Sequence, residues 1–123
     1  MEITDLFLIN RMIPVLTINK LETALPLCTA LIKGGLNVIE ITLRTKLTLD
    51  SVEILSKEFP EVRIGVGTLL DPQDLNRAKN SGACFAVSPG LNMDLVRQAE
   101  TVGLAYLPGI QTSSEAMTAY RYG

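Results

Sequence analysis

Short apolar runs alternate with amphipathic helical patterns along this 123-residue chain, and this alternation constrains its fold more than any other feature. Five runs have the length and composition of strands, and successive runs begin about 20 to 26 residues apart. A strand–helix unit of that length makes a right-handed crossover, so the sheet is predicted to be parallel. The predicted strands are residues 12–18, 37–44, 63–69, 85–88 and 105–108.

Side chains that can cap a helix stand at each of the five predicted helix starts that follow these strands. Two of them have a glutamate three residues later, which is the spacing of a capping box, and one precedes a proline. A short leading helix is also expected within the first eleven residues. The predicted caps are Asn19 (with Glu22), Thr48, Asp71 (before Pro72), Asn92 and Thr112 (with Glu115).

Composition indicates one globular domain over residues 1–123, since 47% of the residues are hydrophobic and 20% are charged, with no linker or low-complexity segment. A net charge of −2 gives no electrostatic footprint for nucleic acid. No apolar run is long enough to span a bilayer, and the first residues lack the pattern of a signal peptide. We therefore expect a cytoplasmic protein with no membrane or nucleic-acid partner.

Histidine is absent, which removes the commonest general base and the commonest metal ligand. The two cysteines, Cys28 and Cys84, do not stand in a metal-binding spacing and are expected to be buried thiols. We expect neither a metal nor a cofactor. Acid–base chemistry would then depend on carboxylates, lysine, tyrosine or water.

The second strand bears on the choice between two architectures, an incomplete (β/α)8 barrel and a five-stranded open parallel sheet of the flavodoxin type. At alternate positions of 37–44, apolar side chains share one face, while Glu40, Thr42 and Arg44 share the other. A barrel strand whose inner face points into a site has this pattern, although an edge strand with a solvated face has it too. Length argues against a complete barrel, which needs roughly 200 residues or more. Pro14 suits a sheet edge.

Glu40 and Arg44 form the most informative pair of polar residues. Four residues apart in one strand, they would point the same way, about 13 Å apart along the backbone. Both side chains are long enough to converge on a small ligand between them. The alternative is an ion pair on a solvated strand face.

Turn and glycine motifs follow the later strands. The run from Gly65 to Thr68 has two glycines and ends in a hydroxyl, but lacks the spacing of a dinucleotide fingerprint. Proline–glycine pairs, at Pro89 and at Pro108, end the fourth and fifth strands. Ordinary turn chemistry explains these pairs, but their recurrence is notable because barrel sites form at the C-terminal ends of strands.

Four segments together resemble bacterial 2-keto-3-deoxy-6-phosphogluconate (KDPG) aldolases and the related 4-hydroxy-2-oxoglutarate aldolases. The order and spacing of the segments are similar to the successive strand motifs of that family, and the similarity runs from about residue 13 to residue 123. The segments are VIEITLRT (38–45), GVGTLL (65–70), AVSPGL (86–91) and LPGI (107–110) followed by Thr112, Ser114 and Glu115.

This resemblance implies a (β/α)8 barrel and a class I aldolase, in which a lysine forms a Schiff base with a 2-keto acid and cleavage releases pyruvate. It implies that Glu40 is the general acid–base carboxylate and that Arg44 and Thr68 hold the pyruvate carboxylate. It implies that Pro89 lines the pocket. The implied partners are small keto acids such as pyruvate or KDPG, and the family looks trimeric, so a homo-oligomer is expected.

The sequence departs from the family at the Schiff-base lysine, which the family carries in a K-x-F-P-like motif on the sixth strand and which is not found here. We expect no aldolase turnover from this chain alone, and of its lysines we expect only Lys46 on the side of the site, in a solvated loop. The chain would then be a truncated aldolase barrel, or a non-catalytic module that binds pyruvate-like carboxylates or assembles with a partner. A flavodoxin-like signalling or cofactor domain is disfavoured by the polar face of 37–44.

Overall fold

Five parallel strands form one open sheet in the computed structural model, which describes residues 3–123. The strands are β1 (Val15–Leu16), β2 (Val38–Thr42), β3 (Arg63–Gly67), β4 (Phe85–Ser88) and β5 (Ala105–Pro108). The helices are α1 (Ile3–Ile9), the 3₁₀ turn η1 (Leu21–Thr23), α2 (Ala24–Lys33), α3 (Thr48–Glu58), α4 (Pro72–Asn80), α5 (Met93–Val102) and α6 (Ser113–Arg121).

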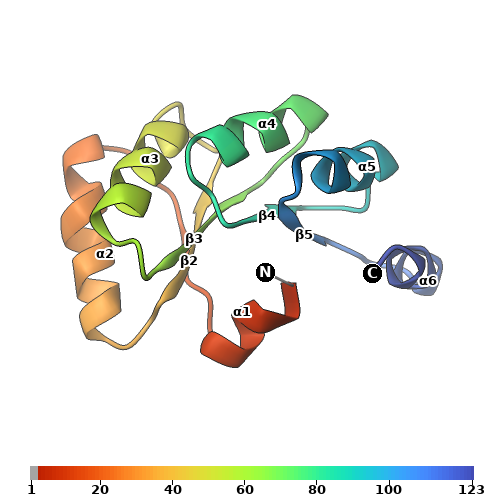
Figure 1. Ribbon diagram of the computed structural model, residues 1–123, viewed down its shortest axis with the longest axis horizontal. Coiled ribbons are helices and arrows are strands. Elements are labelled where there is room, and N and C mark those ends of the chain that lie inside the picture. The colour runs from red at the N-terminus through yellow and green to blue at the C-terminus, as the bar shows by residue number, and fades with distance from the viewer. Residues whose placement is uncertain (1–2) are drawn as a thin grey trace.

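Strand order separates the two architectures that the sequence left open. The order is β1-β2-β3-β4-β5, and every neighbouring pair is parallel. A flavodoxin-like sheet reverses its order and is covered by helices on both faces. Here α2, α3, α4 and α5 all lie along one side of the sheet, while α1 lies on the other (Figure 1). The arrangement is therefore a segment of a (β/α) barrel, as predicted, and β1 at its edge accommodates Pro14.

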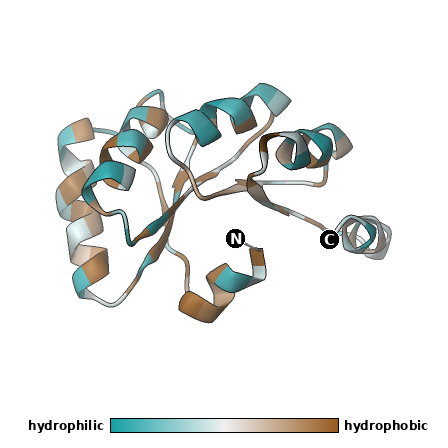
Figure 2. Ribbon diagram, viewed as in Figure 1, coloured by the Kyte–Doolittle hydropathy of each residue, from teal (hydrophilic) through white to brown (hydrophobic). Residues whose placement is uncertain are grey.

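The larger core lies between the sheet and the helices. Alternate residues of β2 and β3, such as Ile41 and Ile64, point out of the barrel segment into this core and are fully buried there with Leu55 and Leu75. Figure 2 shows the matching pattern, with largely apolar strands and helices that carry both polar and apolar residues. This core fixes the positions of the strands, and hence the spacing of whatever the inner face carries.

The inner face of the sheet has a much smaller core. Leu6 of α1 packs with Val38 and Phe85, and all three are almost completely buried. Val38 and Phe85 lie at the amino-terminal ends of their strands, so α1 covers that end of the inner face. The short leading helix predicted from the sequence is confirmed at Ile3–Ile9, and the first two residues lie outside the described part of the chain.

Three of the five predicted caps are confirmed. Asp71 and Thr112 both form complete capping boxes, and the side chain of Asn92 accepts a hydrogen bond from the backbone N–H of Asp94. The predictions for Asn19 and Thr48 are wrong. The chain enters α2 through η1 without a side-chain cap, and the hydroxyl of Thr48 donates instead to the carbonyl of Thr42, at 2.6 Å.

Three predicted strands are too long: the predicted strands 12–18, 37–44 and 63–69 are observed as Val15–Leu16, Val38–Thr42 and Arg63–Gly67. Only Val15–Leu16 of the predicted first strand pairs with β2, because Pro14 has no N–H to donate and offers only its carbonyl, to Glu40 N. The chain turns after Thr42, so Arg44 lies in the turn that follows β2 rather than on the strand. Strand alternation therefore does not set the direction of the Arg44 side chain, contrary to the prediction.

Candidate active site

The Glu40 side chain lies across the backbone of the neighbouring strand. In the parallel register Glu40 stands beside Gly65 and Thr42 beside Gly67. A Cβ atom added to Gly67 would nevertheless fall 2.6 Å from Cδ and 2.9 Å from Cγ of Glu40. The carboxylate thus reaches forward from its own level to the level of Gly67. It points toward the carboxyl ends of the strands, where barrel sites form.

The other inward glycine of β3 lies beneath an aromatic ring. A Cβ atom on Gly65 would collide with the ring of Phe85, which belongs to the small inner core. The inner surface of β3 is therefore bare backbone at two successive levels. Phe85 fills the lower level and the Glu40 carboxylate the upper one, so a hydrocarbon floor lies below the carboxylate.

Burial decides the electrostatics of Glu40. Desolvation raises the pKa of its carboxyl above the ordinary value of 4.5, and the positive charge of Arg44 partly offsets this effect. A half-buried carboxyl with a raised pKa exchanges protons more readily near neutral pH, as a general acid–base group requires. Arg44 itself is exposed. The structure thus places Glu40 and Arg44 within electrostatic reach of each other, without an ion pair among the described contacts.

Thr68 directly follows Gly67 and has an unusual backbone conformation. Its φ of 64° makes it the one residue other than glycine with a positive φ in the described part of the chain. A β-branched residue rarely adopts this left-handed region, and such strain concentrates at functional sites. Thr68 is half-buried and directly follows β3. It is therefore next in the chain to Gly67, which the Glu40 carboxylate contacts.

Pro89 follows β4 and is exposed. Its contacts are with the next loop, since a Cβ atom on Gly109 would lie 2.6 Å from the carbonyl carbon of Pro89. Gly109 N also donates to the carbonyl of Ser88, at 2.9 Å, and the hydroxyls of Ser88 and Tyr106 share a 2.5 Å hydrogen bond. The described contacts join Pro89 to the end of β5 rather than to Glu40.

Threonine side chains that sequence reasoning did not connect hold the ends of β1 and β2 together. The hydroxyls of Thr17 and Thr42 lie 3.1 Å apart, and Thr45 donates to the carbonyl of Ile18 at 2.7 Å. Thr48 donates to the carbonyl of Thr42. These bonds hold the turn that carries Arg44. The only available signal was the density of threonine in this segment, which does not reveal partners.

The lysines lie in two groups. Lys33, Lys57 and Lys79 stand in the last turns of their helices, at the end of the sheet opposite to Glu40's carboxylate, and Lys57 pairs with Glu53. Lys46 follows β2 and is exposed, as expected. Lys20 follows β1 and precedes η1, so it also lies at the carboxyl end of the sheet, contrary to the expectation that Lys46 alone would.

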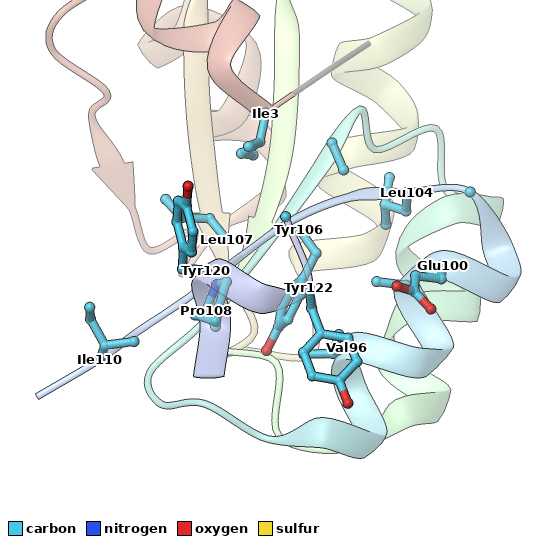
Figure 3. A pocket seen from close by; sticks show the side chains of 15 residues that line it. Ile3, Val96, Glu100, Leu104, Tyr106, Leu107, Pro108, Ile110, Tyr120 and Tyr122 are labelled. Carbon is cyan, nitrogen blue, oxygen red and sulfur yellow. The ribbon is translucent and has the colours of Figure 1, made fainter. Parts of the chain in front are cut away.

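A hollow of about 620 Å³ lies elsewhere, between α5, β5 and α6 (Figure 3). Tyr106, Leu107, Tyr120 and Tyr122 contribute to its lining, but none of the four predicted site residues does. Glu100 is the sole charged side chain among the described residues that line it, and these residues offer no cation for a carboxylate or a phosphate. We therefore place the candidate site at Glu40 rather than in this hollow.

Other ligand chemistries have few candidates in the part of the chain that the structure describes. No group of three or more cysteines, aspartates and glutamates there could hold a metal ion. Cys28 is buried, and burial raises the pKa of its thiol to about 11, whereas Cys84 is only half-buried, contrary to expectation. Among residues 3–123, no helix has both the length and the apolar character to cross a membrane.

Comparison with known proteins agrees with the geometry. The family described as "Aldolase: KDPG and KHG aldolase" matches residues 3–123. The chain belongs to this family. It is 43% identical over 111 residues to the KHG/KDPG aldolase of Escherichia coli, and 45% identical over 113 residues to the 2-dehydro-3-deoxy-phosphogluconate aldolase of Pseudomonas aeruginosa. These alignments cover 90% and 92% of the chain, but only 52% and 51% of the two relatives, so the chain spans about half their length.

Solved structures of the family have the same arrangement of strands and helices. The KDPG aldolase of Zymomonas mobilis is 37% identical with a TM-score of 0.94, over 100% of this chain and 59% of the other. The KDPG aldolase of Legionella pneumophila, solved with pyruvate captured at low pH as a covalent carbinolamine intermediate, is 37% identical with a TM-score of 0.92, over 96% of this chain and 57% of the other.

Proposed function

We propose that this chain carries the acid–base and carboxylate-binding part of an aldolase site that cleaves a KDPG-like or 4-hydroxy-2-oxoglutarate-like keto acid to pyruvate. The observation that carries the proposal is the position of the Glu40 carboxylate. It is half-buried, has a raised pKa, and lies at the carboxyl end of the sheet within reach of the charge of Arg44. Family membership supplies the reaction class, and these residues supply the local chemistry.

In the proposed reaction, a lysine amine condenses with the 2-keto group, and the protonated imine accepts the electrons of the bond that breaks between C3 and C4. Glu40 takes the proton of the C4 hydroxyl through a water molecule and returns a proton to the pyruvate carbon. The planar fork of Arg44 suits the substrate carboxylate, and the Thr68 hydroxyl donates a further hydrogen bond to it. Pro89 would line the mouth of the pocket, and no cofactor or metal is needed for these steps.

We further propose that the 123 residues alone do not turn over substrate. The support is the placement of their lysines, three of which stand at the opposite end of the sheet. Lys20 and Lys46, at the carboxyl end of the sheet, are both exposed. The Schiff-base lysine would come from a barrel strand beyond β5.

Borohydride trapping with pyruvate, followed by intact mass, tests this part of the proposal. We expect no pyruvate adduct on the chain, with the Escherichia coli relative as a positive control. Pyruvate binding is tested separately by chemical-shift changes at the amides of Thr68 and Arg44, which we expect to saturate. A stable adduct on Lys20 or Lys46 would overturn the inactivity, whereas an absence of binding would overturn the carboxylate site.

A non-catalytic role in carboxylate binding or assembly is the second candidate. The open sheet leaves β1 and β5 as edges, and exposed edges promote association. The exposed apolar side chains Met12 and Val15 near β1, and Met117 and Tyr120 on α6, add to this tendency. We propose a homo-oligomer for this reason, and a monomer in sedimentation equilibrium would count against it.

A further inference from the structure

The bare inner surface of β3 has a specific consequence for Glu40. Gly67 lies on the inner face with the Glu40 carboxylate directly over its α carbon. Its φ is not positive, because Gly35, Gly82, Gly103 and Gly123 are the glycines with positive φ among the described residues. A residue with a side chain could therefore adopt the backbone conformation of Gly67 without strain. Space, and not conformation, requires glycine there.

The atoms nearest to this space belong to the side chain of Glu40. The three atoms nearest to a Cβ on Gly67 are Oε1, Cδ and Cγ of Glu40. No backbone atom or core side chain is among them. One extra methyl group at this position would therefore displace the carboxylate while leaving the surrounding sheet intact.

We propose that Gly67 is the positioning residue of this site, because its missing side chain makes the recess that holds the Glu40 carboxylate level with the end of β3. The inference rests on the proposed function only for the role of Glu40, since the recess itself is a property of β2 and β3. Without the recess, the carboxylate would have to turn away from the strand into solvent. It would then no longer lie beside Thr68 at the end of β3, and it would lose its partly buried surroundings.

Gly65 provides a matched control two residues away on the same face. A Cβ atom there would stand 2.5 Å from Cε1 of Phe85 and would meet no atom of Glu40 among its three nearest neighbours. Phe85 is 1% exposed and is part of the small inner core. A methyl group at Gly65 should therefore disturb packing and leave Glu40 unaffected, whereas a methyl group at Gly67 should do the reverse.

A double-mutant cycle on the full chain separates these effects. Below the ordinary pKa of 4.5, where the carboxyl is uncharged and its burial carries no charge penalty, we expect Gly67→Ala to lower the thermal midpoint when residue 40 is glutamate. In a Glu40→Ala background, where the recess is empty, we expect the same change to leave the midpoint unchanged or to raise it, since alanine restricts the unfolded chain. Gly65→Ala should lower the midpoint in both backgrounds, because its partner is Phe85.

The pKa of Glu40 reports the position of its carboxylate directly. A substitution that only disturbed packing elsewhere would leave this pKa unchanged. In chain labelled with ¹³C at the glutamate carboxyl carbon, we expect Gly67→Ala to return the Glu40 pKa toward its ordinary value and Gly65→Ala to leave it raised. The proposal would be overturned if Gly67→Ala lowered the thermal midpoint equally in both backgrounds, or if it left the Glu40 pKa unchanged. Both readouts are independent of pyruvate, so a failure of the proposed function would be recognised separately.

Discussion

The two faces of β3 differ in what they contribute, although their residues alternate along the same five-residue strand. On the outer face, Ile64 and Val66 are completely buried against the helices. On the inner face, Gly65 and Gly67 contribute no side chain, and the space above them is occupied from neighbouring strands. The outer face stabilises the fold by burying its own apolar side chains, whereas the inner face accommodates a functional group that belongs to another strand.

The outer face should dominate stability, and Ile64→Ala is the largest effect that we predict. Removing a fully buried isoleucine side chain should cost about 2–5 kcal/mol of unfolding free energy, measured by urea denaturation. The Glu40 pKa should not move, since Ile64 points to the other face. A variant that unfolds normally but has an altered Glu40 pKa would show that the two faces are coupled.

These two faces also differ in how well the sequence predicted them. The outer face could be predicted because it depends on periodicity within one segment, and the caps at Asp71 and Thr112 depend on residues close in sequence. Thr48 failed as a predicted cap because the carbonyl of Thr42 competes for its hydroxyl. The recess at Gly67 depends on the side-chain conformation of a residue 27 positions earlier, on a different strand. No pattern within one segment contains that information.

The predicted site shows the same limit. Glu40 stands on β2, as the strand pattern predicted, and Thr68 and Pro89 directly follow β3 and β4, while the roles of these residues in a site stay predictions. Arg44 was assigned to the strand, yet the chain turns after Thr42. The positive φ of Thr68 could not be foreseen, since β-branched residues rarely adopt it.

The inner face should dominate binding, and Arg44→Ala is the next largest effect. Hydrogen bonds to charged groups contribute about 1.5–3 kcal/mol, so pyruvate affinity should fall about tenfold or more in an NMR titration. The Glu40 pKa should rise further, because Arg44 now lowers it. Arg44→Lys is the control: it keeps the charge and thus the pKa, but loses the planar fork. Unchanged affinity in Arg44→Ala would remove Arg44 from the site.

Strain at the end of β3 gives a smaller effect with two parts of opposite sign. Thr68→Gly should relieve a left-handed conformation that costs about 1–2 kcal/mol, while glycine adds about 0.5–1 kcal/mol of backbone entropy cost. The net change should be a gain of at most about 1.5 kcal/mol, with weaker pyruvate binding because the hydroxyl is lost. Thr68→Ser should keep the binding. A large loss of stability in Thr68→Gly would mean that Thr68 is a packing residue instead.

The smallest effect is a pH dependence that distinguishes a carboxylate whose pKa desolvation raises from one whose pKa backbone hydrogen bonds lower. Because folding raises the pKa of Glu40, its contribution to stability is present below the ordinary value of 4.5 and is lost as pH rises through the raised pKa. Glu40→Gln should therefore be more stable than the natural chain at neutral pH, and this gain should vanish on acidification. Thermal midpoints measured across pH would check it.

Glu115 provides the control of opposite sign. It belongs to the capping box of α6, where the backbone N–H groups of Gln111 and Thr112 donate to its carboxylate and lower its pKa below 4.5. Its contribution is present above the ordinary pKa and is lost as pH falls through the lowered one. Glu115→Gln should accordingly be less stable than the natural chain at neutral pH, and the difference should shrink in acid. If both variants changed stability in the same direction, local burial at the recess would not be what sets Glu40 apart from a carboxylate that only caps a helix.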